Sequence, residues 1–210
     1  MSNSINTPPY KYAQNSDTTI DNALLSRYTA LKAKVIERKE QFASLMKFVE
    51  TETAYLTSPA STKFHLSRKH GLLEHSINVA ETMLKIKETL APEISDESCV
   101  VTALLHDLGK AGMPGHPQYI ENHQPEKYRT PYFWNKELVY LSVPVRSLYI
   151  IGPRFPLTEE EAQAIIYHDG QYVEDNRSVA THEEPLTLLL QYADTWSGFV
   201  IEQNEKFNLL

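Results

Sequence analysis

The chain has 210 residues, of which 41% are apolar, and this is enough for one globular domain with a substantial core. Its formal net charge of -7 gives no global attraction to nucleic acid and weakens a role in duplex binding, although a local basic groove is compatible with it. The one cysteine, Cys99, excludes an intrachain disulfide.

No apolar run approaches the roughly 20 residues that a membrane-spanning helix needs. The polar N-terminus also lacks the apolar centre of a signal peptide. We therefore expect a cytoplasmic protein without a membrane partner.

The first part of the chain predicts a flexible arm followed by helix. Residues 1–19 are rich in Ser, Asn, Thr and Pro and lack periodic apolar residues. Over residues 21–56, apolar residues recur at helical spacing, with an interruption near 38–41. We expect one long helix or two in this segment.

The next predicted helix begins at Gly71 and carries His75. Its apolar residues are Leu72, Leu73, Ile77, Val79, Ala80, Met83 and Leu84. A histidine on such a helix is often packed or capping, so His75 alone does not define a site. Glu74, beside it, is either a surface acid, which we favour, or a proton acceptor near a site.

A His-Asp doublet ends the following helix, whose start Ser95 can cap. The doublet, His106-Asp107, places two metal-ligand types side by side where an apolar run stops. Gly109 is expected to let the backbone leave the helix, and Lys110 offers a point charge for a phosphate. The same residues are also compatible with a polar helix C-cap in which Lys110 is a solvated cation.

The stretch between residues 111 and 131 is rich in Gly, Pro, His, Asn and Tyr and is longer than a typical connection. We expect it to form a lid over the site. Within it, Tyr119, Tyr128 and Arg129 are candidates to stack on or pair with a nucleotide, and the alternative is that they pin the loop to the core.

Helix is expected again from about Ser142 to Tyr149, and two capping boxes predict further helix starts. They pair Thr158 with Glu161, and Thr181 with Glu184, the latter followed by a proline.

His168 follows the first of these capped helices, in the sequence His-Asp-Gly. It either faces a substrate or belongs to a C-cap in which Gly170 is left-handed.

The last helix carries Asp194 within a strongly apolar run. A buried carboxylate is costly unless it is paired or bound to a metal. Asp194 is therefore either hydrogen-bonded to Thr195 or a tyrosine, or it is a metal ligand.

Together these features resemble the HD superfamily of metal-dependent phosphohydrolases. The family pattern is a His on one helix, a His-Asp doublet ending the next and a late Asp on a final helix, which corresponds here to His75, His106, Asp107 and Asp194. The resemblance covers about residues 60–200.

The segment before His75 also resembles an HD subgroup that reads His, a short gap, two glycines and Leu-Leu-Glu-His, except that His70 replaces the first glycine. The resemblance implies an all-α fold with a single HD-type helical domain over 59–210. It would be preceded by the helical segment 20–58 and the mobile arm 1–19.

The resemblance further implies a divalent metal held by the four matched residues. Two imidazoles and two carboxylates suit Mn, Fe, Co, Ni or Zn better than Ca, with Mg also possible. Some HD proteins bind a second ion through extra histidines, for which His116, His123 and His168 are candidates. Lys136 stands where such proteins often have a histidine, and this favours one ion.

We therefore expect a phosphohydrolase that cleaves a phosphate ester or anhydride, most simply of a nucleotide. Asp107 and Lys110 would be catalytic, and the substrate-binding candidates are Arg68, Lys110, His168 and Arg129. Arg68 is equally compatible with ordinary surface charge. The alternatives are a 3'-end exonuclease on single-stranded nucleic acid, a di-iron HD oxygenase and a non-catalytic nucleotide-binding HD protein. The sequence predicts no oligomeric state.

Overall fold

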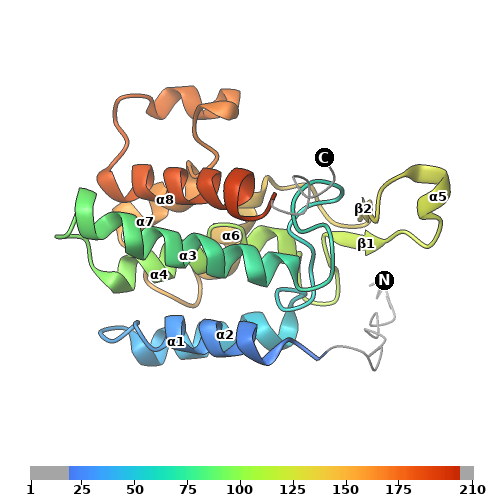
Figure 1. Cartoon of the computed structure of the whole chain (residues 1–210), viewed down its shortest axis with the longest axis horizontal. Coiled ribbons are helices and arrows are strands. Elements are labelled where there is room, and N and C mark those ends of the chain that lie inside the picture. Colours follow the sequence, from blue (N-terminus) through green and yellow to red (C-terminus); the bar gives the residue numbers. More distant parts are fainter. Residues whose placement is uncertain (1–18, 204–210) are drawn as a thin grey trace, which may run out of the picture.

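A computed structural model describes residues 19–203, and the arm predicted over 1–19 lies outside this range except for its last residue. The regular secondary structure of the described part is helical except for one two-stranded sheet, which confirms the all-α prediction (Figure 1). Its helices are α1 (Asn22–Lys32), α2 (Lys39–Glu52), α3 (Gly71–Leu90), α4 (Asp96–Leu105), α5 (Pro125–Tyr128), α6 (Val143–Ile151), α7 (Glu159–Ile166) and α8 (Pro185–Trp196). Shorter turns of 3-10 helix are η1 (Leu108–Ala111), η2 (Gly170–Tyr172) and η3 (Glu174–Val179), and η4 (Ser197–Ile201) is a π-helix that continues α8.

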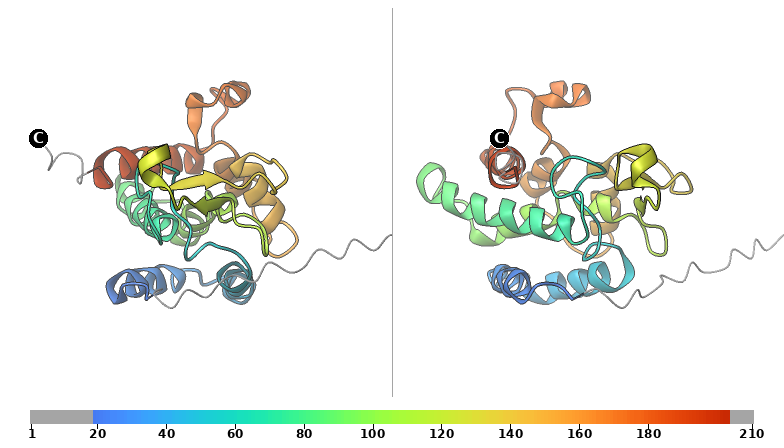
Figure 2. Two further views of the ribbon diagram at one scale, coloured as in Figure 1. Left: turned by 90° about the vertical axis from the view of Figure 1, so that its right-hand side faces the viewer. Right: turned by 45° about the vertical axis from the view of Figure 1, so that its right-hand side comes forward.

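The helices form layers around α3, which packs against both α4 and α8. Helices α1 and α2 lie as a separate layer along the α3 and α4 side, whereas α8 covers the opposite side (Figures 1 and 2). One hydrophobic core joins the layers, because Leu24, Tyr28 and Leu45 from the first layer pack in the same cluster as Leu72 and Leu104. None of the helices in residues 19–203 combines the length and apolar character needed to cross a membrane.

The predicted segment 21–56 forms two helices, and the break between them lies at 33–38, earlier than expected. The cause is a carboxylate from α4. Glu97 accepts hydrogen bonds of 2.8 Å from the backbone N–H groups of both Ile36 and Glu37. These groups therefore have partners outside a helix, and the chain can turn there at low cost.

Arg38, at the start of α2, ties three helices together. Its Nε lies 2.7 Å from Glu97 of α4, and its two terminal nitrogens lie 2.6 and 2.7 Å from the Glu161 carboxylate of α7. Glu161 is fully buried and also accepts from the backbone N–H of Thr158, which confirms the predicted capping box. The guanidinium thus compensates two carboxylates inside the fold.

The second predicted capping box is wrong. Thr181 has a left-handed backbone with φ 73°, and α8 begins after Glu184 with no side-chain cap. Gln163 of α7 does the capping instead, because its Oε1 accepts from the backbone N–H of Glu184 at 2.7 Å. Pro185 at the first helical position agrees with the expected start.

The long connection after η1 is not a structureless loop. It holds β1 (Tyr119–Glu121) and α5, and β1 pairs antiparallel with β2 (Tyr132–Trp134). Buried Arg146 of α6 anchors the base of this hairpin by donating to the side chain of Gln118 and, at 2.7 Å, to the carbonyl of Val139. The expected helix over 142–149 is α6.

Replacing Arg38 by Ala should lower the free energy of unfolding by about 3 kcal/mol, because it leaves two buried carboxylates without their cation. Urea denaturation followed by circular dichroism measures the effect. Lys34→Ala is the control, since Lys34 pairs with Asp96 in an exposed ion pair and should cost less than about 1 kcal/mol. Equal small effects of both variants would contradict the role assigned to Arg38.

Candidate metal centre

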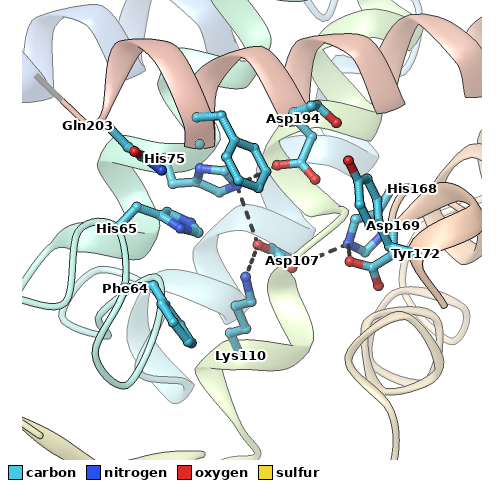
Figure 3. Close-up of a pocket in the computed structure, with 13 residues that line it drawn as sticks. Phe64, His65, His75, Asp107, Lys110, His168, Asp169, Tyr172, Asp194 and Gln203 are labelled. Carbon is cyan, nitrogen blue, oxygen red and sulfur yellow. Dashed lines mark hydrogen bonds and ion pairs between the residues drawn. The ribbon is translucent and has the colours of Figure 1, made fainter.

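Five side chains from different parts of the chain converge on one point of the helical bundle. His75 comes from the first turns of α3, His106 and Asp107 from the end of α4, His168 from the end of α7 and Asp194 from α8. Figure 3 shows His75, Asp107, His168 and Asp194 pointing toward one another. The three histidines and Asp107 are buried, whereas the carboxylate of Asp194 is partly exposed.

The doublet is placed by a sharp change of backbone at the end of α4. His106 is the last residue with helical angles, and the chain then tightens into η1. Gly109 is needed because a Cβ there would lie 2.2 Å from the carbonyl oxygen of Val143 in α6. The expectation that Gly109 lets the chain leave the helix therefore needs correction, since the left-handed exit is at Gly112, with φ 79°.

The potential ligand atoms surround a small volume. His75 Nε2 lies 3.0 Å from Asp194 Oδ1 and 3.5 Å from Asp107 Oδ2, and His106 Nε2 lies 3.4 Å from Asp107 Oδ2 and 4.0 Å from Asp194 Oδ1. His106 Nε2 is fully buried and has no hydrogen-bond partner. A buried polar atom normally has a partner. A divalent cation among these four side chains would provide one, so the residues fit a metal ion.

Each imidazole is oriented by a hydrogen bond from its other nitrogen. His106 Nδ1 donates to the carbonyl of Ala103 and His168 Nδ1 to that of Ile165, both at 2.8 Å. His75 Nδ1 donates to the carboxylate of Glu202 at 3.0 Å. In all three cases Nε2 is left to face the centre, which is the usual arrangement of metal-binding histidines.

Glu202 is a site residue that the sequence analysis missed. It follows Asp194 by eight residues, or about 2.2 turns of α-helix, which would place it about 80° around the axis from Asp194 in a regular helix. The π-helix η4 widens the turn, as shown by the bond from Glu202 N to Ser197 O at 2.9 Å, five residues back. Glu202 therefore reaches His75, and nothing in the local sequence signals the π turn.

Positive charge on neighbouring groups compensates the carboxylates. Burial alone would lower the pKa of His75, but hydrogen bonds to Asp194 and Glu202 raise that pKa to about 10. Burial likewise opposes protonation of His168, yet the contact with Asp107 raises its pKa to about 9. Burial would raise the pKa of Asp107, but Lys110 and His106 hold this pKa well below its ordinary value.

Lys110 lies on the opposite side of Asp107 from His168. Its Nζ is 2.5 Å from Asp107 Oδ2, while His168 Nε2 is 3.5 Å from Asp107 Oδ1. Burial would lower the pKa of Lys110, but the charge of Asp107 raises it, so the ammonium remains charged. Both oxygens of Asp107 therefore already have a cationic neighbour.

These groups open onto a cavity of about 440 Å³. His75, Asp107, Lys110, His168 and Asp194 line it. Its aromatic walls include Phe64, Tyr172 and Phe199, which the sequence did not single out.

Two predicted substrate-binding residues lie outside this cavity. Arg68 forms an ion pair of 2.7 Å with Glu74, so Glu74 is the surface acid that we favoured. Arg68 borders a neighbouring depression that shares Phe64 and His65 with the cavity. Arg129 is exposed and is not among the lining residues. No residue of 111–131 lines the cavity, so the structure gives the predicted lid no support.

Of the extra histidines, only His168 belongs to the cluster. His116, His123 and Lys136 border another pocket at the hairpin. Lys136 is exposed there and does not replace a histidine of the cluster, so the prediction that its charge favours one ion is wrong. The glycine that the HD subgroup has at the position of His70 also has a physical explanation, because the backbone there has φ 65°, the left-handed conformation that favours glycine.

Comparisons with known proteins agree with this arrangement. Residues 72–195, which include all four proposed ligands, match the HD domain family, and the chain belongs to that family. It is 34% identical over 85 residues to the dihydroneopterin 2',3'-cyclic phosphate phosphodiesterase of Methanocaldococcus jannaschii. The aligned region covers 38% of this chain and 34% of the relative. The chain thus matches about a third of that relative's length. No solved structure gives a significant match.

Metal affinity should rise with pH. A histidine must be neutral to bind a metal, and the pKa of His75 is about 10, so protons compete with the ion throughout the neutral range. Calorimetric titration with Mn²⁺ between pH 6 and 8 should show an affinity gain of up to about tenfold per pH unit for each displaced proton. The same affinity at both ends of this range would contradict the assignment of His75 as a ligand.

Glu202→Gln should weaken Mn²⁺ binding by about 10- to 100-fold, because the hydrogen bond from His75 loses its charged acceptor. The same calorimetric titration measures the loss. Glu174→Gln is the matched control, since Glu174 lies exposed on η3. Unchanged affinity in Glu202→Gln would show that His75 does not need this partner.

Proposed function

We propose that this protein is a metal-dependent phosphohydrolase that acts on a small phosphate ester of the nucleotide class. The observation that carries the proposal is the convergence of His75, His106, Asp107 and Asp194, with His106 Nε2 buried and unpartnered. Membership in the HD domain family supports the same class of reaction.

The four converging side chains are proposed to hold one divalent cation, with Mn, Fe, Co, Ni and Zn as the favoured metals. When bound, such an ion lowers the pKa of a water ligand and polarises a phosphoryl oxygen. Lys110 and His168 flank Asp107 on both sides. The positive charge of Lys110 disfavours a second cation on its side of this carboxylate.

The remaining polar groups of the cavity would bind and stabilise the phosphate. The ammonium of Lys110 would neutralise negative charge that develops on the phosphoryl oxygens in the transition state. His168, which holds a proton on Nε2 because of Asp107, would donate a hydrogen bond to the phosphate from the other side. Neither group needs to move far, since both already line the cavity.

A phosphodiester is the favoured substrate because the relative's name specifies a cyclic phosphate phosphodiesterase. The net charge of -7 favours a small substrate over a long nucleic acid.

Asp107→Ala should abolish hydrolysis while most of the helicity remains, because the ion would serve the chemistry more than the folding. Product release with Mn²⁺ would be measured on nucleoside monophosphates, triphosphates, cyclic nucleotides and single-stranded oligonucleotides, with circular dichroism as the check on folding. Asp175→Ala, in η3 outside the cluster, is the control. Full activity of Asp107→Ala would reject the site, and two bound ions per chain by elemental analysis would reject the mononuclear proposal.

Lys110→Met should lower kcat by about 10²- to 10³-fold, because it removes preorganised positive charge from the phosphoryl site. Lys85→Met, on the exposed surface of α3, should have no effect. Steady-state kinetics on the best substrate of the panel would test this, and an unchanged kcat would limit Lys110 to a structural partner of Asp107.

A further inference from the structure

A second groove opens directly from the metal-centre cavity, between η2 and the end of α8. The groove and the cavity share His168, Asp169, Tyr172, Thr195 and Phe199 in their walls. Tyr192 and Trp196 complete its aromatic lining. We call Tyr172, Tyr192, Trp196 and Phe199 the aromatic groove. In Figure 3, Tyr172 lies beside His168 and Asp169, across the cluster from Phe64.

The aromatic groove lies on the solvent side of α8, with Tyr172 of η2 opposite and Phe199 of η4 at its end. Tyr192 and Trp196 are four residues apart, which places them on one face of α8. The core face carries Leu189, Leu190 and Ala193 instead. All four groove side chains are more than half exposed, with Tyr172 at 85% and Trp196 at 56%. A cluster of exposed aromatic residues on one face generally marks a binding surface.

The charges in this groove select the kind of occupant. No Lys or Arg is among its lining residues, Asp169 contributes a negative charge, and His168 lies at the wall that the groove shares with the cavity. Lys110, the ammonium proposed to bind phosphate, lines the cavity and not the groove. The groove therefore suits a neutral planar ring that stacks on aromatic side chains.

We propose that the aromatic groove binds the planar nitrogen heterocycle of the substrate, such as a nucleobase, while the attached phosphate lies at the metal centre. The position of the phosphate rests on the function proposed above. Ring binding does not, because stacking on the groove needs neither the ion nor hydrolysis. The shared wall explains how one molecule reaches both places, since Tyr172 and Phe199 border the groove and the cavity alike.

Tryptophan fluorescence tests ring binding without any turnover. The chain has two tryptophans, so Trp134→Phe leaves Trp196 as the reporter. Adenosine should quench this variant saturably, and adding Tyr172→Ala should abolish saturation. Adding Tyr140→Ala instead is the control, because Tyr140 is exposed outside the groove, and it should change nothing. Absence of saturable quenching would overturn the proposal.

Kinetics separates this proposal from the proposed function. With Mn²⁺, Tyr192→Ala, which changes the groove and not the cavity, should raise KM for adenosine 2',3'-cyclic phosphate by about tenfold or more. It should leave KM for ribose 2',3'-cyclic phosphate, which has no ring, unchanged. Equal KM changes for both substrates would overturn the ring site.

The two failures have different signatures. Saturable quenching without hydrolysis of any substrate would reject the phosphohydrolase and keep the ring site. Hydrolysis without saturable quenching would keep the phosphohydrolase and reject the ring site. Trp196 emission that responds to protein concentration and not to adenosine would assign the groove to a second copy of the chain, and this would also overturn the proposal.

Discussion

Two carboxylates inside an apolar helical bundle are the constraint on which the rest of the site depends. Asp107 and Asp194 can remain charged there only because His75, His168 and Lys110 stand within 3.5 Å of one or the other. An uncompensated buried charge would cost several kcal/mol, more than a marginally stable domain can tolerate beside its other costs. The same requirement makes the centre suitable for a divalent cation, because the ion and the protons on the histidines are alternative sources of positive charge.

The arrangement of helices follows from the need to bring these groups together. α3 lies between α4 and α8 and therefore presents His75 to carboxylates on both neighbours. The π turn at η4 adds a third carboxylate, because it brings Glu202 within hydrogen-bond distance of His75 on α3. A π turn is less stable than α-helix and is often found at functional sites. Here the carboxylate that it delivers fixes the orientation of a proposed metal ligand.

Much of the fold and of the cluster could be predicted from the sequence, because local rules decide them. The helices that carry His75, His106 and Asp194 have apolar periodicity, and Ser95 and the pair of Thr158 with Glu161 cap as expected. The failures lie where distant contacts decide. Gln163 replaces Thr181 as the cap of α8, Glu97 moves the break before α2, and Lys136 lies on the hairpin away from the cluster. Gln163 and Glu97 are both distant in sequence from the backbone groups that they bind.

Helix α8 shows why the aromatic groove was invisible in the sequence. In the one-dimensional pattern, Tyr192 and Trp196 look like part of the apolar run that surrounds Asp194, and an apolar run predicts burial. Only the packing of α8 on α3 and α7 determines which face is covered, and Leu190 and Ala193 occupy that face. Asp194 lies at the border between the covered and the open face. The same helix therefore carries a proposed metal ligand, Asp194, and two residues of the proposed stacking surface, Tyr192 and Trp196.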